Sequence, residues 1–427
     1  MLRLAYSLLL FLSVPLIMLR LLARGFRQRG YWQNVGERFG SYFRQPLHGS
    51  LWVHAVSVGE MRAAQPLIAR LRSDYPGRAI VVSCMTATGR DTAQELYADT
   101  INCVYLPYDF SRLHRRFIAH FRPAVLLIME TEIWPNLLAA CAAAEVPTVL
   151  VNGRLSEQSR RGYARVAPVR ALIREALQSL RAVAAQSPAD AARLASLGAR
   201  HPVVTGNIKF DVPSHPALVA RGLAWRKSLP SGKRVLLAAS TRDGEEKLLL
   251  EAYRQALDAE ARGHILLVLV PRHPQRFDAV HQVILAAGLS ACRRSDRETA
   301  PDDVDVWLGD SMGEMAAYIA LCDVAFIGGS LLPLGGQNLI EACAQGKPVV
   351  MGPSTYNFAD AVRLAVEAGA MRQGDNADAV VAAADEWLKD EARRGVAARA
   401  ALAFARAHAG ATEKTMGLIA PLLSAGN

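Results

Sequence analysis

Short runs of apolar and β-branched residues alternate with stretches of helical periodicity from about residue 48 onward. The runs that we expect to form strands are 51–56, 79–83, 103–106, 124–129, 148–151, 235–239, 265–270, 304–308, 324–327 and 348–351. Helix-period stretches such as 60–72 and 135–144 lie between them. This alternation is typical of βαβ units, so the pattern predicts an α/β fold with parallel sheets covered by helices.

The alternation weakens once, in a proline-containing stretch between residues 209 and 232, and then resumes. A chain of 427 residues is long enough for two domains of ordinary size. We therefore predict two Rossmann-like domains, over residues 46–211 and 233–427, joined by a hinge at 212–232. The Ala-rich stretch 377–407 is expected to form one or two closing helices.

The first 45 residues have a different pattern, which predicts contact with a membrane. Residues 4–19 form an uncharged run of sixteen, interrupted by Pro15, and the segment 1–45 holds seven Arg and one acid, Glu37. As a helix the run is about 24 Å long, which is short of the roughly 30 Å of a hydrocarbon core. We expect a membrane anchor or a helix that lies on the membrane, with a buried core helix and a cleaved signal peptide as alternatives.

The charge of this segment predicts its orientation. Of the net charge of +10, +6 lies in residues 1–45. Basic residues next to an apolar segment attract anionic lipids and favour the cytoplasmic side for the body of the chain.

Composition and missing motifs exclude several classes of protein. The chain is 51% hydrophobic and 21% charged, which excludes a disordered or fibrous protein. The six Cys include no C-x-x-C pair, so neither disulfides nor a structural metal are expected. Dinucleotide enzymes, P-loop NTPases and nucleophile-elbow hydrolases lack support because their defining motifs are absent, and no nucleic-acid-binding module is present.

Ligands of open α/β sheets bind at the carboxyl ends of the strands, and the first predicted strand is followed by Ser57-Val58-Gly59-Glu60. Ser-x-x-Glu at a helix start is the spacing of a capping box, in which Glu60 folds back onto the Ser57 N–H. The alternative is a general base at the floor of a cleft, where Glu60 accepts a hydroxyl proton. The spacing alone favours the capping box.

Two more acids follow the fourth predicted strand, in the segment 130–136. Glu132 could simply complement the dipole of the helix that begins near Pro135, whereas Glu130 directly follows the apolar run and is harder to explain by structure alone. Arg154 and Lys209, in the motifs 152–154 and 206–211, could each hold an anion or be ordinary surface charge.

Turns after the strands of the second half predict a nucleotide cleft. They are 240–242, 271–274, 310–314 and 328–330, and the last leads through Gly335-Gly336-Gln337-Asn338 into a helix that carries Glu341. Glycines and an Asn at a helix start expose backbone N–H groups to a phosphate. Asp303-Val304-Asp305 spells D-x-D but precedes or begins a strand, so we interpret it as solvated charge.

An ordered series of motifs resembles one protein family. An apolar amino-terminal segment is followed by HAVSVGE (54–60), LPYDF (106–110), METEIWPN (129–136), GNIKFD (206–211), PRHPQRF (271–277), DSMGEM (310–315), FIGGS (326–330), GGQNLIEA (335–342) and MGPSTYNF (351–358). In this order, over nearly the whole chain, they resemble the bacterial 3-deoxy-D-manno-oct-2-ulosonic acid (Kdo) transferases of lipopolysaccharide synthesis.

The resemblance implies a GT-B fold, with the amino-terminal domain facing a lipid acceptor and the carboxyl-terminal domain holding CMP-Kdo. It implies an inverting transfer of Kdo onto the lipid A precursor, lipid IVA, at the cytoplasmic face of the bacterial inner membrane. CMP leaves with a single phosphate, so an Arg or Lys and a helix amino terminus can carry the developing charge, and no metal or other cofactor is expected. Glu60 matches the family's catalytic base, and Glu130 and Lys209 match positions that stabilise the transition state. The positions that match the CMP site are Pro271, Arg272, Met312, Gly313, Glu314, Asn338, Leu339, Ile340 and Glu341.

One departure from the family concerns Gln337, where such proteins often have His. Gln keeps hydrogen bonding but cannot take a proton near neutral pH, which argues against an acid role there and leaves donor binding intact. Competing interpretations are another GT-B envelope glycosyltransferase or a sugar-nucleotide epimerase that uses a UDP-sugar, and a catalytically silent membrane scaffold. The number of Kdo residues transferred is not determined by any motif.

Overall fold

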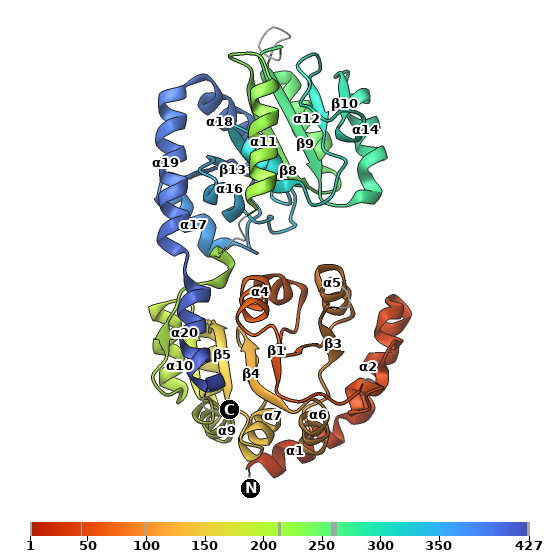
Figure 1. The fold of residues 1–427 in the computed structure, drawn as a ribbon, viewed down its shortest axis with the longest axis vertical. Coiled ribbons are helices and arrows are strands. Elements are labelled where there is room, and N and C mark those ends of the chain that lie inside the picture. Colours follow the sequence, from red (N-terminus) through yellow and green to blue (C-terminus); the bar gives the residue numbers. More distant parts are fainter. Residues whose placement is uncertain (1, 44, 98–99, 212–214, 258–262, 425–427) are drawn as a thin grey trace. The chain divides into compact units, whose positions relative to one another are not determined.

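The computed structural model describes residues 2–43, 45–97, 100–211, 215–257 and 263–424. The chain divides into two compact units, a first unit of residues Met1–Asp211 and Ala409–Asn427 and a second unit of residues Val212–His408. In each unit the described residues include a seven-stranded sheet whose paired strands are parallel (Figure 1).

The sheet of the first unit has the strand order β3-β2-β1-β4-β5-β6-β7. Its strands are β1 (Ser50–His54), β2 (Ile80–Cys84), β3 (Asn102–Tyr105), β4 (Pro123–Met129), β5 (Thr148–Gly153), β6 (Ala182–Ala185) and β7 (Val203–Val204). Alternate residues of β1 enter different cores, with Leu51 and Val53 on one face of the sheet and Trp52 on the other. Both faces are therefore buried, which explains why the strands are near-continuous apolar runs.

The helices of the first unit cover both faces of this sheet. They are α1 (Leu2–Leu12), α2 (Val14–Arg27), α3 (Val58–Ala63), α4 (Gln65–Asp74), α5 (Ala87–Tyr97), α6 (Ser111–Phe121), α7 (Pro135–Ala143), α8 (Glu157–Arg165), α9 (Ala167–Gln178), α10 (Pro188–Leu197) and α20 (Ala411–Ser424), with the 3₁₀ turns η1 (Arg29–Trp32), η2 (Val35–Phe39) and η4 (Ile208–Phe210). The helix predicted at 60–72 is thus two helices, with Pro66 in the first turn of the second one.

The sheet of the second unit has the order β10-β11-β9-β8-β12-β13-β14. Its strands are β8 (Arg234–Thr241), β9 (Ile265–Pro271), β10 (Ala291–Arg293), β11 (Val306–Leu308), β12 (Val324–Ile327), β13 (Val349–Met351) and β14 (Met371–Gln373). Its helices are α11 (Pro216–Ser228), α12 (Glu245–Ala256), α14 (Phe277–Ala286), α15 (Met315–Leu321), α16 (Ile340–Ala344), α17 (Ala359–Glu367), α18 (Ala377–Lys389) and α19 (Glu391–His408), with η5 (Pro274–Arg276) and η6 (Arg294–Asp296).

All ten predicted strands are present, although the one predicted at 304–308 begins at Val306. Four strands were not predicted, namely β6, β7, β10 and β14. They have only two to four residues each, so none of them gives an apolar or β-branched run long enough to predict a strand. Their strand conformation depends on pairing with a neighbour in the sheet.

Two boundaries differ from the predicted domain division. The stretch 212–232, predicted as a hinge, contains helix α11 of the second unit, while residues 212–214 lie outside the described residues. Helix α11 packs against α15 so closely that a Cβ on Gly222 would lie 2.1 Å from the carbonyl oxygen of Ala317. The sequence of α11 has almost no amphipathic periodicity, so the hydrophobic pattern did not reveal this helix.

The carboxyl terminus also departs from the predicted division, which placed residues 233–427 in one domain. Helix α20 belongs to the first unit, where its Met416, Ile419 and Leu423 join the core beneath β1, β2 and β4. The carboxylate of Asp211 accepts the backbone N–H groups of Gly410 and Thr412 and so caps the start of α20. The chain therefore returns to its first unit after α19.

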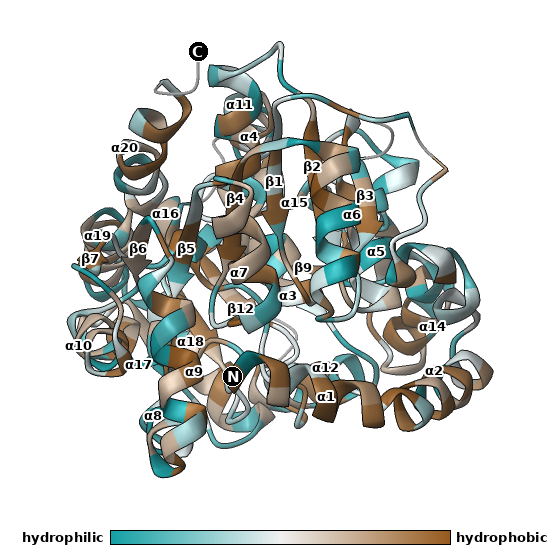
Figure 2. Ribbon diagram, turned by 90° about the horizontal axis from the view of Figure 1, so that it is seen from below, coloured by the Kyte–Doolittle hydropathy of each residue, from teal (hydrophilic) through white to brown (hydrophobic). Residues whose placement is uncertain are grey.

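The apolar amino-terminal segment forms two helices rather than one. No single helix among the described residues is both long and apolar enough to cross a membrane, and α1 and α2 pass that test only as a pair bent by 49°. The break falls at Ser13, just before Pro15. Hydrophobic residues run along both helices (Figure 2), and the exposed ones include Leu4, Leu8, Leu9, Phe11, Leu12, Leu16, Leu19 and Phe26.

Helix α1 is attached to the first unit by polar contacts. The hydroxyl of Tyr6 donates to Oδ2 of Asp109 (2.9 Å), and Nδ2 of Asn136 donates to Oγ of Ser7 (3.0 Å). Asp109 and Asn136 are both buried. One side of α1 is thereby fixed to the domain, and its exposed apolar side chains lie away from these contacts.

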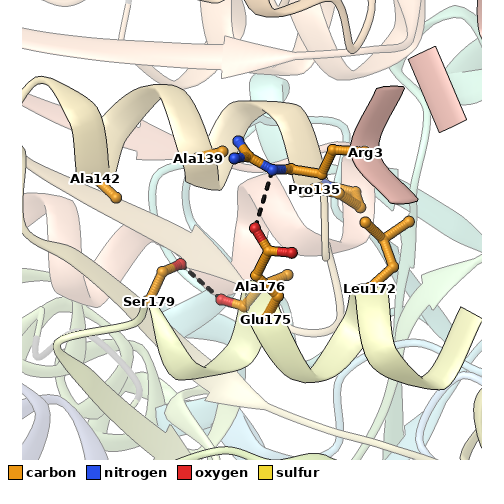
Figure 3. A pocket seen from close by; sticks show the side chains of 8 residues that line it. All are labelled: Arg3, Pro135, Ala139, Ala142, Leu172, Glu175, Ala176 and Ser179. Atoms are coloured by element: carbon orange, nitrogen blue, oxygen red, sulfur yellow. Dashed lines mark hydrogen bonds and ion pairs between the residues drawn. The ribbon is translucent and has the colours of Figure 1, made fainter. Parts of the chain in front are cut away.

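A cavity of about 150 Å³ lies beside the start of α1, between α7 and α9 (Figure 3). An ion pair between Nε of Arg3 and Oε1 of Glu175 (2.9 Å) crosses it, and the other lining residues are Pro135, Ala139, Ala142, Leu172, Ala176 and Ser179. None of these is a residue of the predicted site.

Candidate active site

Glu60 lies in the first turn of α3, where the chain leaves the carboxyl end of β1. Oγ of Ser57 accepts the Glu60 N–H (3.3 Å), and the Glu60 carboxylate accepts the N–H of Val56 (2.8 Å) and the hydroxyl of Ser57 (3.0 Å). The predicted capping interaction is therefore present, although the carboxylate reaches the N–H of Val56 rather than that of Ser57. The same bonds fix the carboxylate in one orientation, so a capping role and a catalytic role are compatible.

The environment of Glu60 suits a base. Burial raises the pKa of Glu60 to about 7, the negative charges of Glu130 and Glu132 act in the same direction, and the hydrogen bonds from Val56 and Ser57 oppose them. A carboxyl group with a pKa near the working pH combines a substantial ionised fraction with the basicity needed to take a proton.

Glu130 and Lys209, two of the predicted site residues, lie together. Oε1 of Glu130 is 3.2 Å from Nζ of Lys209. Glu130 directly follows β4 and has a φ of 56°, and its N–H donates to the carbonyl of Val151 in the neighbouring strand. A left-handed conformation is uncommon for a residue with a side chain, and such positions concentrate at functional sites.

Glu132 is a third carboxylate of this site, and the sequence did not place it among the catalytic residues. It precedes α7 by three residues, so it does not lie in the first helical turn as the dipole interpretation required. Nε1 of Trp134 donates to its Oε2 (2.8 Å), and burial raises its pKa. The signal available in the sequence was its spacing of two residues from Glu130.

Asp109 was also missed, although it lies in one of the motifs. Its Oδ1 accepts the N–H of Leu137 (2.9 Å) and faces Nε2 of His114 (2.9 Å), while its Oδ2 accepts the N–H of Asn136 (3.2 Å) in addition to the hydroxyl of Tyr6. It caps the helix that follows the acidic loop 130–134. Its role depends on contacts between distant segments, which no local pattern reveals.

Lys209 lies in η4, a turn that is bound to the end of β5. Oδ1 of Asn152 accepts the N–H of Ile208 (3.0 Å), and Oδ1 of Asn207 accepts the N–H of Lys209 (3.0 Å). Arg154, the other cation considered in this region, has an exposed side chain. The structure therefore places Lys209 against the acidic cluster.

The predicted donor residues of the second unit follow β9, β11 and β12, at the carboxyl edge of its sheet. Pro271 ends β9, and the N–H of Arg272 donates to the carbonyl of Thr241 at the end of β8 (3.0 Å). Met312 is exposed, and Gly313 has a φ of 79°, in the turn that precedes α15.

Glu314 is held by cations rather than exposed. Its Oε1 accepts Nη1 of Arg221 (2.6 Å) and Nη2 of Arg294 (3.2 Å), and its Oε2 accepts the hydroxyl of Ser311 (2.6 Å). Burial alone would raise the pKa of Glu314, but the bonds from Ser311 and Arg221 and the charge of Arg294 lower it. Glu314 is therefore an ionised residue that orders its turn.

The run Asn338–Glu341 leads into α16, which begins at Ile340. Nδ2 of Asn338 donates to Oε1 of Glu341 (3.0 Å), and Oδ1 of Asn338 accepts the N–H of Ile340 (3.0 Å). The side chains of Leu339 and Ile340 are fully buried, so these two positions can meet a ligand only through the backbone.

Glu245 orders the loop after β12 and was not identified from the sequence. It is fully buried, its Oε1 accepts the N–H groups of Ser330 and Leu331 (2.8 Å each), and its Oε2 accepts that of Gly329 (2.6 Å). A carboxylate that binds three consecutive amides fixes the glycine-containing turn at the sheet edge.

The D-x-D pattern has a structural role. Asp303 forms an exposed ion pair with Arg297 (3.0 Å), and Asp305 accepts the N–H and hydroxyl of Ser290. Among the residues that the structure describes, no group of three or more His, Cys, Asp or Glu side chains is arranged to hold a metal ion.

Comparison with known proteins shows the family of the chain. Residues 33–212 match the family model described as 3-deoxy-D-manno-octulosonic-acid transferase (kdotransferase), and residues 253–403 match the model of glycosyl transferases group 1. A 3-deoxy-D-manno-octulosonic acid transferase of Bordetella pertussis is 43% identical, over 96% of this chain and 97% of the relative. One of Haemophilus influenzae is 33% identical, over 99% of both chains.

Among solved structures, a UDP-GlcNAc 2-epimerase from Neisseria meningitidis bound to UDP-GlcNAc superimposes with a TM-score of 0.55 and 13% identity, over 87% of this chain and all of the other. At this identity the likeness concerns the fold alone, which is the two-domain GT-B arrangement. The two relatives match the chain almost from end to end, with identities that unrelated proteins do not reach. The chain therefore belongs to the 3-deoxy-D-manno-octulosonic acid transferase family of glycosyltransferases.

Proposed function

We propose that this Kdo transferase uses CMP-Kdo as donor and the lipid A precursor, lipid IVA, as acceptor, and that Glu60 is its general base. The observation that carries the proposal is the Glu60 carboxylate, fixed by Val56 and Ser57 at the end of a central strand and tuned to a pKa of about 7. A sugar hydroxyl is a weak nucleophile and needs such a base within hydrogen-bond reach.

The proposed step is a direct displacement. The acceptor oxygen attacks the anomeric carbon of Kdo, Glu60 takes the hydroxyl proton, and the bond to the CMP phosphate breaks with its electron pair leaving on the phosphate. Attack from the face opposite to the leaving group inverts the anomeric configuration.

Lys209 supplies positive charge beside the acidic cluster, and the Glu130 carboxylate holds it there. A fixed ammonium group can stabilise negative charge on the donor as the bond to phosphate breaks, without a divalent ion. In the second unit, Arg272 and the backbone N–H groups near Asn338 and Gly313 would hold the nucleotide.

We further propose that α1 and α2 lie on the cytoplasmic surface of the inner membrane instead of crossing it. The bonds from Tyr6 to Asp109 and between Ser7 and Asn136 attach α1 sideways to the domain, an attachment that a spanning helix would have to break. The exposed Leu and Phe side chains of both helices would enter the headgroup region, and the Arg excess of this segment would attract anionic lipids.

A product assay tests the reaction. Detergent-solubilised protein is incubated with lipid IVA and CMP-Kdo generated in situ, with and without EDTA, and the molecular mass of the lipid product is measured by mass spectrometry. We expect lipid heavier by one or more Kdo units, unchanged by EDTA, and loss of the product with Glu60→Ala. Transfer from a UDP-sugar in place of CMP-Kdo would contradict the donor, and full activity of Glu60→Ala would contradict the base.

A further inference from the structure

The turn that carries Lys209 is bound at several points. Ile208 and Phe210 on either side of it are buried, and Asp211 at its end caps helix α20. Lys209 itself has only one close partner among the described ion pairs, the carboxylate of Glu130. The distance between Lys209 and Glu130 therefore depends on the position of the turn relative to the ends of β4 and β5.

Asn152 attaches the turn to the end of β5. It lies in β5, directly after Val151, whose carbonyl accepts the N–H of Glu130. Its own carbonyl accepts Nε2 of Gln186 (3.0 Å), and its side-chain oxygen Oδ1 accepts the N–H of Ile208, the residue before Lys209. One residue thus joins the strand end beside Glu130 to the turn that bears Lys209.

The left-handed backbone conformation of Asn152 is unfavourable for a residue with a side chain, so its side chain is expected to have a compensating role. Asn152 in β5 and Glu130 directly after the neighbouring strand β4 have φ angles of 55° and 56°, so both are left-handed residues with side chains. The amide nitrogen Nδ2 of Asn152 is buried and makes no hydrogen bond among the described residues. A glycine would adopt this φ without strain and would bury no amide, so what the asparagine adds is its bond to Ile208.

We propose that Asn152 is a positioning residue for Kdo transfer, which acts by holding the Ile208 N–H and thereby keeps the Lys209 ammonium group on Glu130. It touches neither the donor nor the acceptor in this role. The inference rests on the proposed function of Lys209.

The test compares two substitutions at this position. Asn152→Gly keeps the left-handed backbone and removes the acceptor, whereas Asn152→Asp keeps an acceptor oxygen. Asn376→Gly is the matched control, because Oδ1 of Asn376 likewise accepts one backbone N–H, that of Ala379 at the start of α18 in the second unit. Each full-length variant is assayed for kcat and KM with both substrates and for hydrogen exchange of the peptide that contains Ile208.

We expect Asn152→Gly to speed exchange at Ile208 and to lower kcat about ten- to hundredfold, with KM for CMP-Kdo changed less than threefold. Asn152→Asp should restore the protection and recover at least part of the lost kcat, and Asn376→Gly should change neither. A kcat of Asn152→Gly within twofold of the parent overturns the proposal, as does unchanged exchange at Ile208 or an equal loss in Asn376→Gly. If the parent protein transfers no Kdo, the proposed function fails, and the exchange data alone still decide whether Asn152 holds the turn.

Discussion

At the scale of the residue, Glu60 makes the capping bonds of a helix start, and its proposed role as a base is compatible with them, although the sequence presented the two as alternatives. Its carboxylate satisfies the N–H of Val56 at a helix start, and the same burial raises its proton affinity. The hydrogen bond from Val56 lowers the pKa of Glu60 and so makes it a weaker base. The same bond fixes the carboxylate, so less entropy is lost when the side chain is oriented for proton transfer.

The pH dependence of transfer follows from this residue. The base works only when ionised, so kcat/KM should fall by about tenfold per pH unit below an apparent pKa of about 7. Initial rates between pH 5 and 8.5 measure this limb. An acid limb near pH 4.5, where an ordinary Glu titrates, would contradict the assignment.

The contribution of Glu60 to the free energy of unfolding should decrease as pH rises, whereas its activity as a base should increase. The pKa of Glu60 is about 7 in the folded protein against 4.5 for the unperturbed group, so the folded state binds more protons between these values, and the contribution of Glu60 to stability falls as pH rises through that window. Glu60→Gln keeps an acceptor for Val56 and carries no charge. We expect it to raise the Tm of the first unit by at least about 2 °C at pH 8 and by less at pH 5, as measured by calorimetry. A larger gain at pH 5 than at pH 8 would refute this.

At the scale of the element, the acidic loop 130–134 is held at both ends. Its start is fixed by the bond from Glu130 N–H to β5, and its end by Asp109, which caps α7 and also binds helix α1 through Tyr6. The apolar amino-terminal helix is therefore connected to the helix that follows the site through one buried carboxylate.

Asp109→Ala should destabilise the first unit by about 3–5 kcal/mol, because four donors lose a buried acceptor. Tyr6→Phe removes one of these bonds and should cost about 1 kcal/mol. Urea unfolding of the single and double variants measures both values. The cost of Tyr6→Phe should disappear in the Asp109→Ala background, and full additivity would show that the two residues do not interact.

At the scale of the whole molecule, the chain begins and ends in the same unit. Ile419 of α20 is fully buried in the core that also contains strands β1, β2 and β4. Ile419→Ala should therefore cost about 2–5 kcal/mol and act on the first unit only. Hydrogen exchange should quicken in the strands β1 to β6, with β8 to β13 unchanged, and loss of protection in β8 to β13 would contradict this division.

The exposed apolar side chains of α1 are expected to bind the protein to membranes that contain anionic lipid. Leu9 and Phe11 are 64% and 66% exposed, and Val396 on α19 offers a matched control at 60%. The double substitution Leu9→Glu and Phe11→Glu should abolish sedimentation with vesicles that contain anionic lipid, while Val396→Glu should not change it. Equal binding of both variants would rule out α1 as the membrane-binding element.

The sequence by itself determined ten of the fourteen described strands, the two-domain class, and the positions of Glu60 and Glu130 after strand ends. Strands buried on both faces must be apolar along their whole length, and residues that follow them reach one edge of a parallel sheet, so Glu60 and Glu130 could be located from local pattern. Their assigned chemistry came from the motifs, and it stays a prediction.

Only the tertiary structure decided what holds these residues. The bonds from Asn152 to Ile208, from Asp109 to Tyr6 and Asn136, and from Asp211 to the start of α20 join segments up to about two hundred residues apart. The same holds for the return of α20 to the first unit and for the helix within the expected hinge. Side-chain acceptors of this kind have no periodicity, because their partners are set by the packing of distant elements and not by neighbours along the chain.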